Sequence, residues 1–279
     1  MDQKVALITG CSSGFGLLTA IEMRRAGYRV VATMRNLGKR AGLDAAAKEA
    51  GLSLDVRRLD ITEYDSLPGF VEQLVGDHGR LDVLVNNAGF SVSGFAEDLT
   101  LQEIKLNFET NFFGHVAMTK AVLPVMRKQK SGHIIMLSSM AGLIAQPVVS
   151  TYCSTKHALE GWSEAVRIET HSLGIRVVLV EPGAFATDIW EKNVVMGQHA
   201  TSPDSPNLQR SLRFRDFVRN HVAKADAREV ARLIVRVAND PNPRLRYLIG
   251  KDAHAAYWMR RFLPWKRWER MVARHTGID

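Results

Sequence analysis

The start of the chain most restricts the fold, because an apolar strand, a glycine-rich turn and a helix follow one another directly. Residues 4–9 are mainly apolar, and Thr9-Gly10-Cys11-Ser12-Ser13-Gly14-Phe15-Gly16 comes next. Apolar residues at helical spacing then run from Leu17 to Ala26 and stop at Gly27. Such glycines let the backbone approach a pyrophosphate, whose charge the free N–H groups of a helix start can bind. An ordinary glycine-rich turn is the alternative. The residues predicted to hold a dinucleotide here are Gly10, Ser12, Ser13, Gly14, Phe15 and Gly16.

Strand-like and helix-like segments alternate along the rest of the chain. Further strands are expected over residues 29–33, 52–60, 81–85, 133–137, 175–180 and 245–250. The alternation predicts an α/β fold with a doubly wound, mainly parallel sheet of seven strands and helices on both faces. The length fits one large domain over residues 1–279. Ligands of such sheets bind beyond the carboxyl ends of the strands, where Gly10, Arg35, Asp60, Asn87, Ser139 and Pro182 are all expected.

The end of the second strand indicates which dinucleotide is preferred. A site for NAD places an acid there, to hold the ribose 2′-hydroxyl. This chain has Thr33-Met34-Arg35, with no acid and a guanidinium that can pair with a 2′-phosphate. NADP is therefore favoured over NAD, although Arg35 as a plain surface arginine is the alternative. Asp60 could accept from the adenine amino group, and Asn86-Asn87-Ala88-Gly89 could lie against the riboses or brace the neighbouring strand.

Three side chains supply acid–base chemistry for carbonyl and alcohol interconversion. Tyr152 and Lys156 are four residues apart, so on a helix their side chains share a face. A phenol has an ordinary pKa of about 10, and a neighbouring ammonium is expected to lower it. Ser139, at a strand end, could hold the substrate oxygen against the phenol. A solvated helix face is the alternative for this pair. Asn111 interrupts a long helical stretch over residues 100–128, where asparagine is usually unfavourable, so a functional role is suspected.

Together these motifs resemble the short-chain dehydrogenase/reductase family over about residues 4–250, most closely its steroid- and retinol-dehydrogenase-like branch. The resemblance implies a Rossmann-type fold and a catalytic set in which Tyr152 is the general acid/base. Lys156 would lower the pKa of Tyr152 and bind the nicotinamide ribose, and Ser139 rather than Ser138 would polarise the substrate. Asn111 would hold a water that links Lys156 to solvent. The resemblance adds cofactor contacts from Ile61, Ala88, Gly89, Pro182, Gly183, Phe185 and Thr187. It also implies a homodimer or homotetramer through the helices around residues 100–128 and 152–173.

A stretch at about residues 187–224 has no counterpart among the motifs. Two prolines, Pro203 and Pro206, stand among Ser, Asp and Asn, which indicates irregular structure, and a more helical segment follows. We expect a substrate lid, and a surface excursion is the alternative. An apolar substrate pocket is predicted from Phe95, Val148, Val149, Trp190 and Met196. Such a pocket suits a hydrophobic alcohol or ketone.

The C-terminal extension, about residues 251–279, explains part of the net charge of +8. Between Tyr257 and Arg274 there are six Arg/Lys residues and one acid, with tryptophans among them. Packing on the domain or a partner subunit is favoured. Peripheral contact with a membrane surface is second, and binding of nucleic acid is not expected.

The rest of the composition points to a cytoplasmic enzyme. No apolar run is long enough to span a bilayer, and the N-terminus lacks the features of a signal peptide. Cys11 and Cys153 do not suggest a disulfide framework, and the histidines show no metal-ligand spacing. We therefore expect no metal. The leading hypothesis is an NADP-dependent oxidoreductase that interconverts a hydrophobic secondary or allylic alcohol and its ketone or aldehyde. A catalytically silent NADP-binding regulatory or scaffolding module is the alternative, and the complete set of catalytic residues argues against it.

Overall fold

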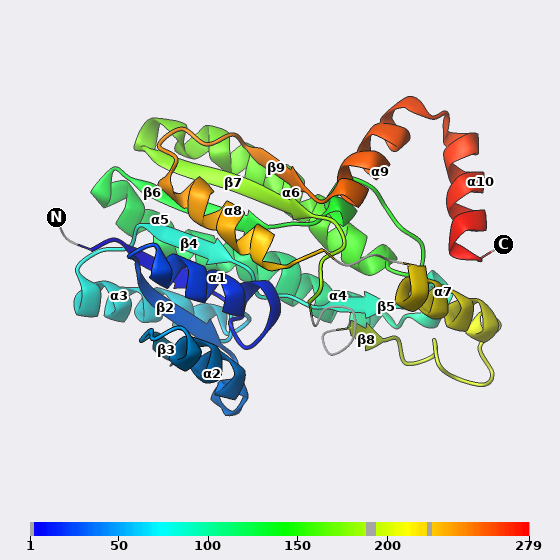
Figure 1. Ribbon diagram of the computed structural model, residues 1–279, viewed down its shortest axis with the longest axis horizontal. Helices are drawn as coiled ribbons and strands as arrows, with labels where there is room; N and C mark the ends of the chain where they lie inside the picture. Colours follow the sequence, from blue (N-terminus) through cyan, green and yellow to red (C-terminus); the bar gives the residue numbers. More distant parts are fainter. Residues whose placement is uncertain (1–2, 188–193, 222–224, 279) are drawn as a thin grey trace.

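The computed structural model describes residues 3–187, 194–221 and 225–278 (Figure 1). Seven strands form one sheet in the order β3-β2-β1-β4-β6-β7-β9, and each neighbouring pair is parallel. The predicted doubly wound, seven-stranded sheet is thereby confirmed. Its strands are β1 (Val5–Ile8), β2 (Arg29–Met34), β3 (Asp55–Arg58), β4 (Val83–Asn86), β6 (Gly132–Leu137), β7 (Ile175–Pro182) and β9 (Arg246–Ile249).

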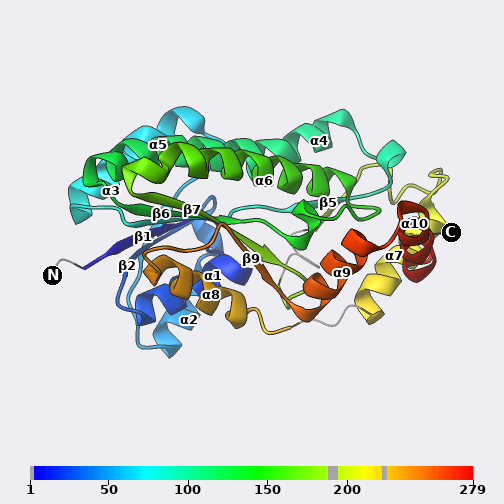
Figure 2. The ribbon, with the colours of Figure 1, turned by 90° about the horizontal axis from the view of Figure 1, so that it is seen from above.

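Helices cover both faces of the sheet (Figure 2). One face carries α1 (Gly14–Arg25), α2 (Ala41–Glu49) and α8 (Arg228–Asn239), and the other carries α3 (Leu67–His78), α5 (Gly114–Gln129) and α6 (Ser150–Thr170). Alternate residues of a strand point to opposite faces. Accordingly, Ala6 and Ile8 of β1 belong to the core beneath α1, whereas Val5 and Leu7 belong to the core beneath α5. Burial on both faces is why the central strands are continuously apolar.

The long helical stretch predicted over residues 100–128 is interrupted where the sequence indicated. Helix α4 (Leu101–Phe108) starts with a capping box, in which Thr100 and Glu103 bind each other's backbone N–H groups. A single π-helical turn over Glu109–Phe113 separates α4 from α5. Such turns are rare and occur frequently at functional sites. Asn111 lies in this turn and is fully buried.

A second, two-stranded sheet was not foreseen from the sequence. Strand β5 (Ser91–Ser93) pairs in parallel with β8 (Val194–Met196). The chain then continues into α7 (Leu208–His221). Side-chain hydrogen bonds tie this region to the segment after β5: Ser205 donates to Asp98 at 2.8 Å, and Asn207 donates to Glu97 at 2.6 Å. The described part of residues 187–224 therefore rests on residues 91–98.

The last two helices leave the end of the sheet beyond β9. Helix α9 (Lys251–Phe262) follows β9, and α10 (Trp265–Thr276) turns back to lie beside α7 (Figures 1 and 2). Arg210 Nε of α7 donates to the carbonyl of Ile278 at 3.0 Å, and Arg213 Nε donates to the carbonyl of Gly277 at 3.0 Å. The end of the chain is thus held by α7. Over the described ranges, none of the helices combines the length and apolar character needed to cross a bilayer.

Candidate active site

The glycine turn after β1 leaves no room for a side chain at Gly10 or at Gly16. Gly10 has a φ of +73°, and a Cβ there would lie 2.7 Å from Ala88 Cα. A Cβ on Gly16 would lie 2.3 Å from the Gly10 carbonyl oxygen. Gly14 has a φ of +57°, in the region that favours glycine. A Cβ added there would lie 3.6 Å from the Cβ of Thr187, an ordinary contact distance. The turn therefore presents bare backbone at the start of α1.

Asn87 holds this turn against the end of β4. Its Nδ2 donates to the carbonyls of Thr9 at 2.7 Å and Gly10 at 3.0 Å. The hydroxyl of Thr9 in turn accepts from the backbone N–H groups of Asn87 and Ala88, each at 3.0 Å. Of the two roles expected for this segment, the structure shows the bracing one directly. These four bonds fix the shape of the loop between two neighbouring strand ends.

The residues around the turn fit a dinucleotide. Helix α1 begins at Gly14 with no acidic residue in its first turn, so the backbone N–H groups of that turn present partial positive charge. Beside it, the hydroxyl of Thr187 is buried and has no hydrogen-bond partner among the described residues. A buried hydroxyl without a partner is costly, so a ligand that bonds to it would relieve that cost. The bare turn and the Thr187 hydroxyl together suit a pyrophosphate and an adjoining polar group.

Arg35 and Asp60 follow the ends of β2 and β3 and lie at the same edge. Their side chains approach to 3.9 Å, and the Arg35 side chain is 76% exposed. Asp60 Oδ1 accepts from the backbone N–H of Thr62 at 3.0 Å and from its hydroxyl at 2.8 Å. Arg35 is therefore a weakly held cation, free to turn toward an anionic group, whereas Asp60 is fixed by its own loop.

Ser139, rather than Ser138, contacts Tyr152. The Ser139 hydroxyl is the polar neighbour of the Tyr152 phenol; it accepts from the N–H of Ala141 at 3.1 Å and donates to the carbonyl of Pro182 at 3.4 Å. Burial raises the pKa of Tyr152 to about 12, and the neighbouring Ser139 hydroxyl opposes that shift only in part. The sequence predicted a lowered pKa, and that prediction is wrong for this structure, because loss of solvation outweighs the favourable contacts. The phenol is protonated at neutral pH.

Lys156 lies on the same helical face as Tyr152, as its spacing predicted. Its Nζ is 5.6 Å from the centre of the Tyr152 ring and donates to the carbonyl of Leu137 at 2.7 Å. Burial lowers the pKa of Lys156 to about 8, and the neighbouring Glu160 partly opposes that shift. The ammonium is thus held by Leu137, the last residue of β6, which directly precedes Ser138 and Ser139.

Asn111 connects the π-helical turn to the loop after β4 and to α6. Its Oδ1 accepts from the N–H of Phe90 at 3.1 Å, while its Nδ2 donates to the Phe90 carbonyl at 2.8 Å. The same Nδ2 lies 3.3 Å from the hydroxyl of Thr155, the neighbour of Lys156. The side chain therefore fixes the backbone between the dinucleotide site and the Tyr152 helix.

Sequence reasoning missed a buried charged cluster behind Lys156. Arg246 Nε lies 3.1 Å from Glu160 Oε2 and 3.5 Å from Glu181 Oε1, and its other arm pairs with Glu164 at 2.7 Å. Burial and the neighbouring Glu160 carboxylate raise the pKa of Glu181 to about 8. The one feature of the sequence that could have indicated this cluster is the position of Glu160, four residues after Lys156 on the same helical face.

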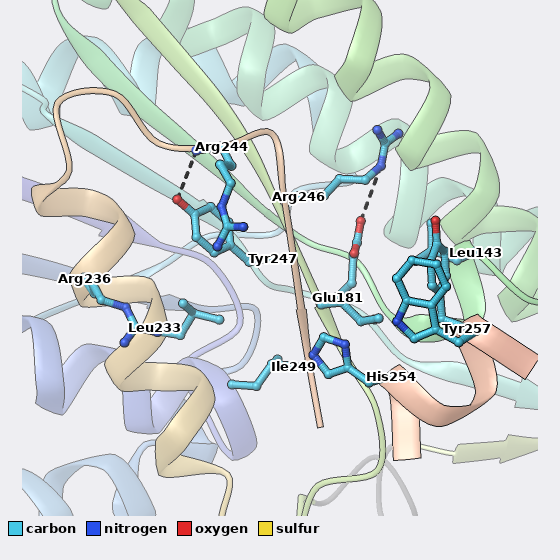
Figure 3. Close-up of a pocket in the computed structure, with 12 residues that line it drawn as sticks. Leu143, Glu181, Leu233, Arg236, Arg244, Arg246, Tyr247, Ile249, His254 and Tyr257 are labelled. Atoms are coloured by element: carbon cyan, nitrogen blue, oxygen red, sulfur yellow. Dashed lines mark hydrogen bonds and ion pairs between the residues drawn. The ribbon is translucent and has the colours of Figure 1, made fainter. Parts of the chain in front are cut away.

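This cluster borders a groove of about 580 Å³ between α8, β9 and α9. Figure 3 shows Glu181 and Arg246 pointing toward one another in the groove. The described residues that line it include none of the predicted catalytic or cofactor-binding side chains. It therefore lies apart from the Ser139–Tyr152 pair.

Three predicted pocket residues come together at the end of β5. The carbonyl of Val148 accepts from the N–H of Gly94 at 2.7 Å, and Met196 pairs with Ser93. Phe95 follows, with the guanidinium of Arg210 4.4 Å above its ring. Val148 has a φ of +66°, a strained value for a β-branched residue. Val149 caps the start of α6, three residues before Tyr152. Trp190 lies outside the described residues.

No cluster of three or more His, Cys, Asp or Glu side chains suited to a metal ion occurs in the described part of the chain. Cys11 and Cys153 are both free and buried. This edge of the sheet brings together a protonated phenol, a hydroxyl and a buried ammonium beside the glycine turn.

Comparison with known proteins identifies this arrangement. The sequence pattern of the family described as short chain dehydrogenase matches residues 4–196. The chain therefore belongs to the short-chain dehydrogenase/reductase family, and it is an oxidoreductase that acts on CH–OH groups with a nicotinamide dinucleotide.

Individual relatives indicate the branch of the family to which the chain is most similar. It is 38% identical to retinol dehydrogenase 8 of Bos taurus over 254 residues, which cover 87% of this chain and 80% of that protein. It is 33% identical to 17-beta-hydroxysteroid dehydrogenase type 1 of Mus musculus over 277 residues, 96% of this chain and 77% of that protein. The predicted likeness to the steroid- and retinol-dehydrogenase branch is thereby confirmed.

A solved structure shows that the whole fold is shared. The crystal structure of a short-chain dehydrogenase from Streptomyces avermitilis superposes with a TM-score of 0.81 at 32% sequence identity. The match covers 99% of this chain and 98% of that one. The likeness therefore extends beyond β9 into α9 and α10.

Proposed function

We propose that this protein is an NADP-dependent oxidoreductase that interconverts a hydrophobic secondary or allylic alcohol and its ketone or aldehyde. The observation that carries the proposal is that the Ser139 hydroxyl neighbours the phenol of Tyr152, with the buried Lys156 on the same helical face. A regulatory module that only binds a dinucleotide would not need a phenol prepared in this way.

Each of these side chains has a distinct part in the proton transfer. Because the pKa of Tyr152 is raised to about 12, its hydroxyl carries the proton at neutral pH, and that proton passes to a carbonyl oxygen as negative charge develops there. Ser139 holds that oxygen at the phenol and stabilises its developing charge. A nicotinamide dinucleotide supplies or accepts the hydride when bound. In the opposite direction the phenolate must form, and the Lys156 ammonium favours it if Nζ moves from the Leu137 carbonyl toward the phenol oxygen.

The preference for NADP rests on Arg35. Its exposed side chain follows β2 with only a 3.9 Å approach to Asp60, so its guanidinium can turn to bind a 2′-phosphate. No carboxylate stands in the Thr33–Arg35 segment to hold a ribose 2′-hydroxyl instead. Asp60 would lie beside the adenine, and the Thr187 hydroxyl would bond to the nicotinamide carboxamide.

A hydrophobic substrate is supported by the apolar side chains near β5 and by the relatives' names. Val148 and Met196 pair through their backbones with the segment at β5, and Arg210 of α7 lies over the Phe95 ring. The described part of residues 187–224 would act there as a substrate lid. The relatives are named for retinol and for hydroxysteroids, both apolar alcohols. We propose the same class of substrate for this chain.

Self-association through the long helices is also proposed. Leu106 of α4, Phe113 at the end of the π-helical turn and Ile168 of α6 are large apolar side chains left exposed. A homodimer or homotetramer would cover them.

The direct test is a panel of retinoids, steroid ketones and simple ketones, assayed with NADPH and with NADH by the absorbance of the reduced nicotinamide. The proposal predicts turnover of apolar members with NADPH and weaker turnover with NADH. Activity on none of the apolar compounds, or a clear preference for NADH, contradicts it.

A further inference from the structure

Four large apolar side chains stand exposed around the turn from α9 to α10. We call Trp258, Met259, Phe262 and Trp265 the aromatic face. Phe262 is 75% exposed, Trp265 is 58% exposed and Trp258 is 51% exposed. Trp258 and Phe262 stack with ring centres 5.8 Å apart and an angle of 13° between them. Large apolar side chains gathered on one surface mark a contact site, because each remains in water in the isolated chain.

Basic side chains border the aromatic face. Arg260 and Arg261 stand within it along the helix, and Lys266 and Arg267 follow Trp265. The Arg260 guanidinium lies 4.8 Å above the Trp265 ring. Between Tyr257 and Arg274 the only acid is Glu269. Tryptophan with Arg and Lys is the composition that anchors peripheral helices at the boundary between lipid headgroups and acyl chains.

We propose that the aromatic face is a docking surface for an anionic lipid bilayer. Trp258, Phe262 and Trp265 enter the headgroup boundary, while the bordering arginines and lysines bind lipid phosphates and carboxylates. A second copy of the chain fits less well, because a symmetric contact through this face would bring the same arginines of both copies together. The helices themselves do not cross the membrane.

The position of this surface connects it to the substrate side of the molecule. The residues that follow α10 accept hydrogen bonds from Arg210 and Arg213 of α7, and Arg210 also covers the ring of Phe95. Figure 2 shows α7, α9 and α10 together at one end of the molecule. A chain docked through the aromatic face therefore has α7 close to the bilayer, where apolar alcohols and ketones are concentrated. The docking proposal itself does not depend on the identity of the substrate.

Co-sedimentation with vesicles tests the proposal on the full chain. Phosphatidylcholine vesicles in which roughly a quarter of the lipid is phosphatidylserine should retain the protein, and added salt should weaken retention. The triple variant W258S/F262S/W265S should bind at least about tenfold less, since each exposed ring contributes apolar burial. These side chains are exposed, so unchanged thermal unfolding is expected and shows that the fold is kept.

Matched variants separate the possible outcomes. W258F/W265F keeps aromatic rings at both positions and should bind vesicles as the natural chain does. Because it removes the two tryptophans of the aromatic face, the quenching of tryptophan fluorescence by brominated acyl chains should be lost. R261A/K266A should reduce binding to anionic vesicles, whereas K48A/K128A removes two exposed charges elsewhere and should not. The proposal is overturned if the natural chain stays in the supernatant, or if W258S/F262S/W265S binds equally well. It is also overturned if that variant changes only the oligomeric state.

Discussion

The amide of Asn111 binds both backbone groups of Phe90, accepting from its N–H at 3.1 Å and donating to its carbonyl at 2.8 Å. Asn107, one turn earlier, donates to the same carbonyl at 2.9 Å. Both asparagines are fully buried, but only Asn111 also reaches Thr155 beside Lys156. The π-helical turn therefore places Asn111 where it joins the dinucleotide side of the site to the Tyr152 helix.

This pair of asparagines gives a matched test of positioning. Asn111→Ala leaves the Phe90 N–H without its side-chain acceptor, so we expect a loss of about 1–3 kcal/mol in the free energy of unfolding. It should also lower kcat by more than tenfold if the turn positions Lys156. Asn107→Ala removes a bond to the same carbonyl, which Asn111 still satisfies, and should leave kcat nearly unchanged. Equal loss of kcat in the two variants argues against a role specific to Asn111.

The glycine turn should tolerate no side chain at Gly16. An added Cβ would lie 2.3 Å from the Gly10 carbonyl and 2.4 Å from Asn87 Nδ2, and both groups belong to the braced loop. We expect Gly16→Ala to destabilise the fold by about 1–3 kcal/mol and to weaken binding of the dinucleotide more than tenfold. Gly76→Ala is the control, because that helical glycine has open space around it and should gain up to about 1 kcal/mol. Calorimetry with NADPH and thermal unfolding measure both effects.

Arg35 should control the choice between the two dinucleotides. Arg35→Ala would remove the proposed charge-assisted bond to a 2′-phosphate, so kcat/KM with NADPH should fall about ten- to a hundredfold. The value with NADH should hardly change, since NADH has no phosphate there. Lys39→Ala, a nearby exposed cation, is the control for general loss of charge. A parallel fall with both dinucleotides contradicts the assignment.

The buried Glu181 should make stability depend on pH. Its pKa is raised from 4.5 to about 8, so the folded chain keeps a proton that the unfolded chain loses. The free energy of unfolding should therefore fall as pH rises between about 4.5 and 8. Glu181→Gln mimics the protonated acid and should flatten that fall. Glu164→Gln, which removes the exposed partner of Arg246, should not. Denaturant unfolding at several pH values distinguishes these outcomes, and an equal slope in the natural chain and Glu181→Gln contradicts the assignment.

Local pattern in the sequence was enough to predict the sheet, the glycine turn and the Tyr152–Lys156 spacing. These features depend on neighbours along the chain: apolar runs, glycines after a strand, and residues four apart on a helix. The cluster of Glu160, Glu181 and Arg246 was not predictable in this way, because α6, β7 and β9 meet only in the folded sheet. The same holds for the pairing of β5 with β8.

Two further differences between the expectations from the sequence and the structure have burial as their cause. The raised pKa of Tyr152 depends on how completely the folded chain excludes water, which spacing alone does not reveal. The sequence also gave no measure of how exposed the side chains of α9 would be, so packing of the C-terminal extension was the favoured expectation. In the structure α10 packs on α7, whereas the aromatic face of α9 and the start of α10 lies in solvent.

The most direct test of the account is the replacement of Tyr152 by Phe. The substitution removes the phenol oxygen, the group that neighbours Ser139, but keeps the aromatic ring. With a substrate found in the panel, kcat should fall about 10²- to 10⁴-fold, the usual contribution of a positioned acid or base. The affinity for NADPH, measured by calorimetry on the same preparation, should stay as in the natural chain. Turnover that continues at the natural rate in Tyr152→Phe contradicts the central claim.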